Sequence, residues 1–173
     1  MAMSPYIRQL RAVWGSSRLL MPSVAGIVYD AEGRLLLVQQ RDDGAWSTPG
    51  GSIEPDETPA DAVVREVFEE TGLFVAPTRL IAVYGGRDFV VHYPNGDETQ
   101  YVSAMFECVI ESGSPPLGGD GDEVLAARFW GLDEARGLKL SPWLARVLAR
   151  LYVRSDTPWF DPPRWRPQAG TSR

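Results

Sequence analysis

The centre of the chain, from Gly51 to Leu73, reads GSIEPDETPADAVVREVFEETGL, and this stretch decides the fold. Thr58 and Pro59 are a strong helix start, because threonine caps free backbone N–H groups and proline fits the first helical turn. Asp61 can complete the cap, and Gly72 ends the helix. Apolar side chains recur at helical spacing and predict one buried stripe. This stripe consists of Ala60, Val63, Val64, Val67 and Phe68.

Glutamates of the same helix fall on the side opposite the apolar stripe. At about 100° per residue, Glu66, Glu69 and Glu70 gather within a sector of roughly 100°. Like charges at this spacing repel one another, and carboxylates near a helix C-terminus also oppose the helix dipole. A hard divalent cation would relieve both effects, since Mg²⁺ prefers carboxylate oxygens and often accepts phosphate as a further ligand. The sequence therefore predicts a metal-binding face on this helix.

The same stretch resembles the Nudix box, in which a glycine, a glutamate, an Arg-Glu pair, a Glu-Glu pair and a final glycine stand at fixed spacing. Every position of the pattern is matched here. The flanking segment 46–50 also resembles the family, and a less specific similarity to a bacterial MutT-like branch extends over residues 5–153. The matched positions are Gly51, Glu57, Arg65, Glu66, Val67, Glu69, Glu70, Gly72 and Leu73.

The resemblance to Nudix hydrolases implies a metal site and the cofactor that it holds. Glu66, Glu69 and Glu70 correspond to the family's ligands for Mg²⁺ or Mn²⁺. The backbone carbonyl of Gly50, just before the box, corresponds to a further ligand. The expected ions would bridge a diphosphate and make a water molecule acidic enough to attack it.

The resemblance also assigns catalytic roles to residues beside the metal ligands. Arg65 is expected to pair with Glu57 and to brace the loop against the helix. The general base is open, because the family takes it either from the box or from a separate loop. Glu123, in the acidic loop before the last expected strand, is the first candidate, and Glu66 is the alternative.

The segments around the box predict an α/β protein with the Nudix fold, an α/β/α sandwich with a mixed sheet. Apolar periodicity predicts a short helix over residues 6–14 and a second amphipathic helix that opens at Ser141 and Pro142. Residues 24–29 and 34–40, joined by a turn, read as a hairpin. A short extended piece is expected at 46–49, and further strands at 80–84, 89–93, 100–110 and 125–131.

Three parts of the chain differ in composition. Residues 1–20 form an N-terminal helical segment, residues 21–153 the expected Nudix domain, and residues 154–173 a tail rich in proline and tryptophan. The prolines exclude a regular helix in the tail. The tail is therefore expected to wrap over the body or to reach a neighbouring subunit, which makes a homodimer possible.

Composition and charge argue against some classes of binding partner. The chain of 173 residues has 17 basic and 23 acidic side chains and a net charge of −6, which argues against binding of long nucleic acid, including RNA ends. Cys108 is the single cysteine and forms no intramolecular disulfide, so a cytoplasmic location is expected. No apolar run approaches the roughly 20 residues that span a bilayer, so no membrane partner is expected.

These observations predict a metal-dependent pyrophosphohydrolase that cleaves a nucleoside diphosphate linked to another group. ADP-ribose or a related nucleotide sugar is the first expected substrate. A nucleoside triphosphate, such as an oxidised deoxynucleotide, is the alternative. A module that senses a nucleotide without cleaving it is a third hypothesis, which the complete set of box carboxylates disfavours.

Overall fold

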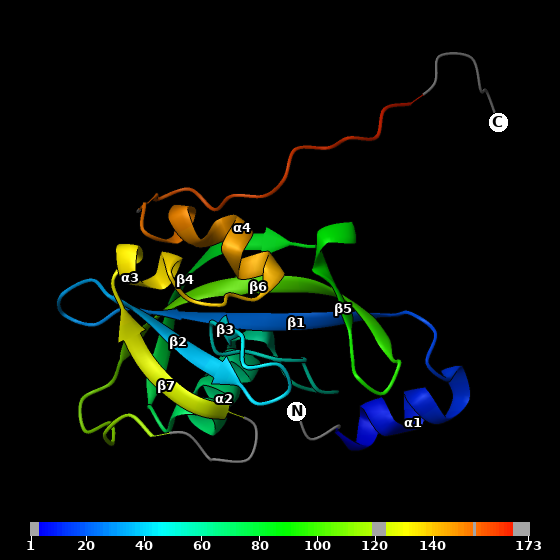
Figure 1. Ribbon diagram of the computed structural model, residues 1–173, viewed down its shortest axis with the longest axis horizontal. Helices are drawn as coiled ribbons and strands as arrows, with labels where there is room; N and C mark the ends of the chain where they lie inside the picture. Colours follow the sequence, from blue (N-terminus) through cyan, green and yellow to red (C-terminus); the bar gives the residue numbers. More distant parts are fainter. Residues whose placement is uncertain (1–3, 119–123, 154, 168–173) are drawn as a thin grey trace.

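The computed structural model describes residues 4–118, 124–153 and 155–167, in which two β-sheets lie between helices (Figure 1). No helix within these ranges combines the length and the apolar character needed to cross a membrane. The elements are α1 (Pro5–Trp14), β1 (Leu19–Val28), β2 (Leu35–Gln40), β3 (Trp46–Ser47), α2 (Pro59–Thr71), β4 (Val75–Tyr84), η1 (Arg87–Phe89), β5 (Val90–His92), β6 (Glu98–Ile110), β7 (Val124–Trp130), α3 (Leu132–Arg136) and α4 (Pro142–Leu151).

The larger sheet has the order β1-β6-β4, with β5 paired to β6, and the smaller sheet has the order β3-β2-β7. Strands β1 and β6 run parallel over the whole of β1, from the pair Leu19 and Thr99 to the pair Val28 and Cys108. The other strand pairs are antiparallel. The predicted mixed sheet within an α/β fold is therefore confirmed.

The expected hairpin of β1 and β2 is wrong in its pairing. The chain turns between Asp30 and Arg34, but the two strands then enter different sheets. One edge of β1 is taken by β6, and the other edge binds the loop that follows β3. In that loop Gly51 and Pro49 offer their carbonyl oxygens to the backbone N–H groups of Val24 and Gly26, at 2.9 and 2.8 Å. Next to the turn, Tyr29 and Leu35 of the expected hairpin form an isolated antiparallel bridge, and the pairing does not continue into β1.

Helices cover the sheets on two sides, which gives the three layers of the sandwich (Figure 1). On one side Val63 and Val67 of α2 belong to the same buried cluster as Val24 of β1 and Leu36 of β2. On the other side α4 contributes Leu144, Val147, Leu148 and Leu151 to a second cluster with Ile27, Leu35 and Leu37. Because β1 and β2 send alternate side chains into both clusters, the strands are buried on both faces.

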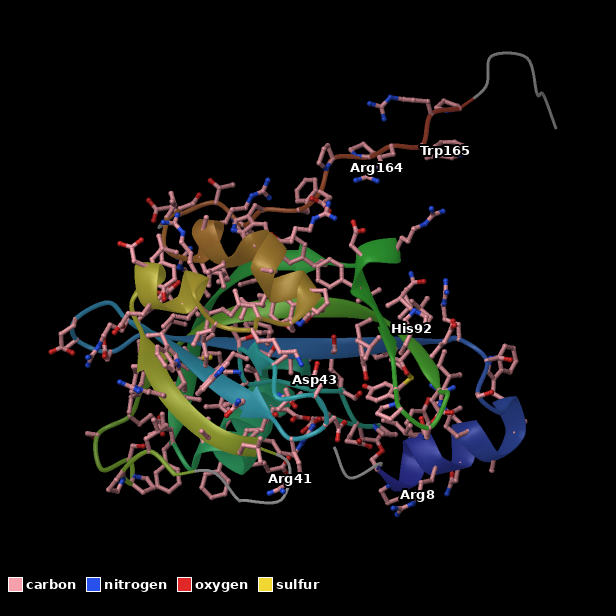
Figure 2. The ribbon with its side chains drawn as sticks, viewed as in Figure 1. Arg8, Arg41, Asp43, His92, Arg164 and Trp165 are labelled. Carbon is pink, nitrogen blue, oxygen red and sulfur yellow. The ribbon has the colours of Figure 1, made fainter. Side chains whose placement is uncertain are left out.

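Part of the C-terminal tail adds to the edge of the larger sheet. The backbone of Trp159 donates to the carbonyl of Ile81 at 3.1 Å and accepts from the N–H of Val83 at 3.2 Å. Its indole packs edge-on against Tyr84, with ring centroids 4.3 Å apart. Farther along, Trp165 is exposed, and the chain there runs away from the body (Figure 2).

Gly26 sets the distance between β1 and α2, and a larger residue should disturb it. A Cβ atom at this position would lie 2.5 Å from Cγ2 of Val67. Gly26→Ala should lower the free energy of unfolding by about 1–3 kcal/mol, the usual range for overpacking. At Gly118, where the nearest atom would lie 3.9 Å away, alanine should change it by less than about 0.5 kcal/mol. Equal urea midpoints for the two variants would contradict this interpretation.

Candidate functional site

The caps of α2 form as the sequence predicts. Thr58 Oγ1 accepts a hydrogen bond from the N–H of Asp61 at 3.2 Å and donates to its carboxylate at 2.6 Å. At the other end Gly72 adopts a left-handed conformation with φ of 73°, and its N–H bonds to the carbonyl of Phe68 at 2.7 Å. These caps fix where the helix begins and ends, and therefore which side chains face β1.

The rotation of α2 differs from the sequence expectation. Glu66 and Glu70 lie on the buried side of the helix with Val63 and Val67, rather than opposite the apolar stripe. Phe68, expected in the stripe, is exposed and packs on Phe74. The reason is the glycine loop, residues 49–51 after β3, which places polar backbone against this side of the helix and gives the carboxylates a buried environment that hydropathy alone does not reveal.

The glycine loop can approach β1 and α2 because it carries no side chains at two positions. Gly50 has φ of 154°, and a Cβ atom there would lie 2.3 Å from the carbonyl oxygen of Val24. At Gly51 a Cβ atom would lie 2.5 Å from Oε1 of Glu66. Any side chain at position 51 would therefore occupy the space of the Glu66 carboxylate.

Glu66 and Glu70 are almost completely buried, with 6% and 2% of their surface exposed. The N–H of Gly50 donates to Oε2 of Glu70 at 2.9 Å. The side-chain amide of Gln40, at the end of β2, donates to the other oxygen at 3.4 Å. The contact of Gln40 with Glu70 does not follow from the local sequence, because it depends on the pairing of β2 in the smaller sheet.

Arg65 ties the remaining acidic residues of the stretch together. Its guanidinium donates to both oxygens of Glu57 at 2.8 and 2.9 Å, which confirms the expected pair. It also donates to Glu66 at 2.8 Å, to Glu69 at 3.0 Å and to the carbonyl of Ser52 at 3.0 Å. All five N–H groups of the guanidinium are thus directed at oxygen atoms of the helix and of the loop before it.

These contacts shift the pKa values of Glu57 and Arg65. The hydrogen bonds from Arg65 hold the pKa of Glu57 below its ordinary value, and the N–H of Glu54 adds to the effect. The same carboxylate raises the pKa of Arg65, with Glu66 and Glu69 contributing in the same direction. The arginine therefore remains charged and holds Glu57 ionised.

A cleft of about 310 Å³ opens beside the glycine loop. Gly50, Gly51 and Gln40 line one part of it, which brings the cleft next to the carboxylates of α2. Phe89 and Trp143 form an aromatic wall, with ring centroids 6.4 Å apart and planes inclined at 29°. Such a concave site, apolar on one side and polar on the other, is typical of small-molecule binding.

The NUDIX domain model matches residues 19–151 of this chain. The chain belongs to the NUDIX family.

Other proteins of this family resemble the chain over shorter or longer segments. A MutT-like protein of Streptomyces ambofaciens is 52% identical over 62 residues, which are 36% of this chain and 40% of that protein. Phosphatase NudJ of Escherichia coli K12 is 31% identical over 102 residues, 58% of this chain and 61% of NudJ. The chain thus spans 40 to 61% of the length of these two curated relatives.

A solved structure extends the similarity to the whole fold. The crystal structure of an ADP-ribose pyrophosphatase from Streptococcus suis superposes with a TM-score of 0.60 and 27% sequence identity. The alignment covers 80% of this chain and 96% of that protein. The Nudix fold predicted from the sequence is therefore confirmed.

The carboxylates of the Nudix motif divide into two groups. Glu69, with 51% of its side chain exposed, lies beside Arg65 together with Glu66, while Glu70 binds the N–H of Gly50. Among the described residues, no group of three or more Asp, Glu, His or Cys side chains is arranged to hold a metal ion. Glu123, the first candidate for the general base, lies outside the described residues.

The carboxylate oxygens of the motif are suitable ligands for a hard divalent cation. Glu66 and Glu70 are buried carboxylates one helical turn apart, and both lie against the backbone of the glycine loop. Two buried carboxylates beside each other repel unless a cation compensates them. Arg65 supplies one such cation to Glu66, and oxygen ligands of this kind are those that Mg²⁺ and Mn²⁺ prefer.

Arg65→Lys should separate the bracing role of Arg65 from its charge. Lysine keeps the charge but cannot donate in parallel to both oxygens of Glu57, so we expect a loss of about 1–3 kcal/mol in the free energy of unfolding at neutral pH. The pKa of Glu57, measured by carboxyl-carbon NMR, should rise toward its ordinary value.

The sign of the accompanying pH effect follows from the lowered pKa of Glu57. A carboxylate with a lowered pKa stabilises the folded state above its ordinary pKa, and this stability is lost as the pH falls through the folded-state pKa. The wild type should therefore lose more stability than Arg65→Lys during acid titration below about pH 4.5. Parallel stability curves for the two proteins would contradict the assigned role of Arg65.

Proposed function

We propose that this Nudix protein is a divalent-metal-dependent pyrophosphohydrolase that acts on a nucleoside diphosphate linked to a further group. The observation that carries the proposal is the burial of Glu66 and Glu70 against the glycine loop, next to a cleft of about 310 Å³. A complete Nudix motif at a cleft of this kind supports hydrolysis of a phosphoric anhydride bond. Its products are a nucleoside monophosphate and the phosphorylated remainder.

ADP-ribose or a related nucleotide sugar is the first substrate class. The structural neighbour from Streptococcus suis, which is named as an ADP-ribose pyrophosphatase, supports this choice. An oxidised nucleoside triphosphate is the alternative. Assembly into a homodimer and a cytoplasmic location remain part of the proposal, the latter because the single cysteine, Cys108, is buried as a free thiol.

Glu66, Glu69, Glu70 and the carbonyl of Gly50 are the proposed ligands of Mg²⁺ or Mn²⁺. When bound, the cation would screen the charge of the diphosphate and make a water molecule more acidic. The acidic cleft makes this screening necessary, because Asp43 also lines it (Figure 2). The N–H of Gly50 holds the Glu70 carboxylate in its buried position.

Other residues of the motif act by positioning and by proton transfer. Arg65 and Glu57 are positioning residues, since their mutual contacts hold the loop of Ser52 and Glu54 against α2. Glu123 is the proposed general base, and Glu66 is the alternative. A carboxylate beside a metal-bound water can accept its proton, because the metal makes that water more acidic.

Glu70→Gln tests the metal-ligand assignment with a nearly isosteric change. Removal of one carboxylate charge should lower kcat with ADP-ribose and Mg²⁺ by at least about 100-fold, while the melting temperature stays within about 4 °C. Glu32→Gln, in the exposed turn after β1, is the matched control and should retain full activity. Wild-type turnover by Glu70→Gln would remove Glu70 from the ligand set.

Glu123→Gln separates the base from the metal ligands. Loss of a general base typically costs about 100- to 10,000-fold in rate. We expect a slower chemical step in single-turnover measurements and an unchanged Mn²⁺ affinity by calorimetry. An unchanged rate would transfer the role to Glu66.

A panel of nucleotides tests the activity as a whole. The protein with Mg²⁺ should release AMP from ADP-ribose, detected by chromatography, more efficiently than it hydrolyses nucleoside triphosphates. Absence of products from every diphosphate and triphosphate would instead favour a nucleotide-sensing module.

A further inference from the structure

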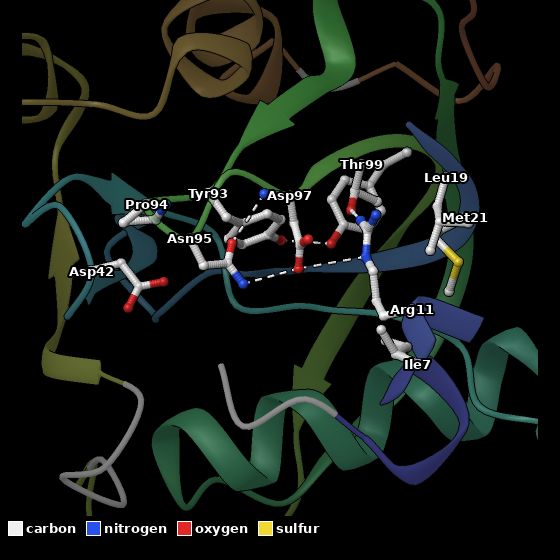
Figure 3. A pocket seen from close by; sticks show the side chains of 11 residues that line it. Ile7, Arg11, Leu19, Met21, Asp42, Tyr93, Pro94, Asn95, Asp97 and Thr99 are labelled. Atoms are coloured by element: carbon white, nitrogen blue, oxygen red, sulfur yellow. Dashed lines mark hydrogen bonds and ion pairs between the residues drawn. The ribbon is translucent and has the colours of Figure 1, made fainter. Parts of the chain in front are cut away.

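A second cavity, of about 280 Å³, lies between α1 and the β5–β6 hairpin (Figure 3). Ile7 and Arg11 of α1 line it, together with Leu19 and Met21 of β1 and with side chains of the hairpin. The hairpin residues are Tyr93, Pro94, Asn95, Asp97, Thr99 and Tyr101. The N-terminal helix therefore completes this cavity, although α1 lies outside the match to the NUDIX domain, which begins at residue 19.

The second cavity adjoins the cleft beside the Nudix motif. Asp42, Tyr93, Pro94 and Tyr101 line both spaces. Each space alone is at or below the lower end of the range for small-molecule sites, about 300–1,000 Å³. A ligand with two halves, joined where these four residues lie, can therefore occupy both.

Arg11 builds the cavity wall but has no N–H group to offer a phosphate. It donates to the carbonyls of Gly15 and Ser17 at 3.1 and 2.8 Å, and to the carbonyl and hydroxyl of Glu98 and Thr99 at 2.7 and 2.9 Å. Its Nε lies 3.5 Å from the carboxylate of Asp97, toward which the side chain points in Figure 3. The five N–H groups of a guanidinium are thereby directed at protein oxygens.

The remaining polar groups of the cavity suit hydroxyl groups. The hydroxyls of Tyr93 and Tyr101 lie 2.7 Å apart, so one donates to the other and one hydrogen is left for a ligand. Burial raises the pKa of Tyr93, which keeps its hydroxyl protonated. Asp42, at the junction of the two spaces, supplies carboxylate oxygens that accept hydrogen bonds, and Leu19 and Met21 supply apolar surface.

We propose that this cavity binds the uncharged, hydroxyl-bearing sugar on the far side of the diphosphate, with Asp42 accepting hydrogen bonds from its hydroxyls. The proposal rests on the proposed function and specifies its substrate class. A triphosphate would direct a charged phosphate toward Asp42, and Arg11 is already engaged by Asp97 and backbone carbonyls. The cavity thus selects sugar-linked diphosphates against triphosphates.

The test compares, in Mg²⁺ and by calorimetry, the binding of AMP and of ADP-ribose with a methylene group in place of the bridging diphosphate oxygen, which prevents turnover at that bond. Asp42→Asn removes a negative charge, so by Coulomb's law alone it should strengthen the binding of both anions. If Asp42 accepts hydrogen bonds from the sugar, the variant should instead bind this ADP-ribose analogue about five- to tenfold more weakly, which is within the range for the loss of a typical hydrogen bond. AMP binding should not weaken.

Matched variants complete the experiment. Tyr93→Phe should weaken the binding of the ADP-ribose analogue and leave that of AMP unchanged, whereas Tyr6→Phe, on α1 but outside the cavity, and Asp133→Asn, on α3, should change neither. Stronger or unchanged binding of the analogue by Asp42→Asn would overturn the proposal. An equal loss for both ligands would also overturn it, because the nucleoside half would then occupy the cavity.

The same samples distinguish this proposal from the proposed activity. If the wild type with Mg²⁺ releases no AMP from ADP-ribose, the pyrophosphohydrolase assignment fails. A selective loss of analogue binding in Asp42→Asn would still support the sugar site. Conversely, turnover with no effect of the two cavity variants on binding would retain the activity and reject the sugar site.

Discussion

The close approach of α2 and the glycine loop to β1 is the constraint on which the site depends. A side chain at Gly26 would collide with Val67, one at Gly50 with the carbonyl of Val24, and one at Gly51 with Glu66. The edge of β1 that does not pair with β6 forms hydrogen bonds with Pro49 and Gly51. The loop is therefore fixed to this core strand by backbone hydrogen bonds. The packing of α2 and the hydrogen-bonded loop together fix the positions of Glu66 and Glu70.

Burial of these carboxylates has a cost in free energy that the structure offsets locally. Arg65 neutralises part of the charge by contacts to Glu57, Glu66 and Glu69, and Gly50 donates a backbone hydrogen bond to Glu70. An ionised carboxylate buried without such partners would raise its pKa and become neutral. Arg65 therefore serves both the fold and the site. It compensates the charge of the buried carboxylates, and it keeps carboxylate oxygens at the edge of the cleft.

Features that depend on residues near in sequence, such as the ends of α2, could be predicted. Features that depend on residues distant in sequence, such as the rotation of α2 and the pairing of β1, could not. The limits of α2 follow from Thr58, Pro59 and Gly72, and the pair of Arg65 and Glu57 follows from the motif. The rotation of α2 was wrong because periodicity assigns glutamates to solvent, whereas the glycine loop buries Glu66 and Glu70. The predicted pairing of β1 with β2 was wrong for a similar reason, since β1 pairs instead with β6, which lies about 80 residues later in the sequence.

The N-terminal helix lies outside the Nudix motif, yet it lines the second cavity. Its own sequence indicates only an amphipathic segment, and none of its residues is buried. Its position is set by Arg11, which joins α1 to Glu98 and Thr99 at the start of β6. Strand β6 continues from there beside β1, so the helix and the glycine loop are anchored to the same parallel pair of strands. A change in α1 can therefore alter the second cavity without displacing the carboxylates of α2.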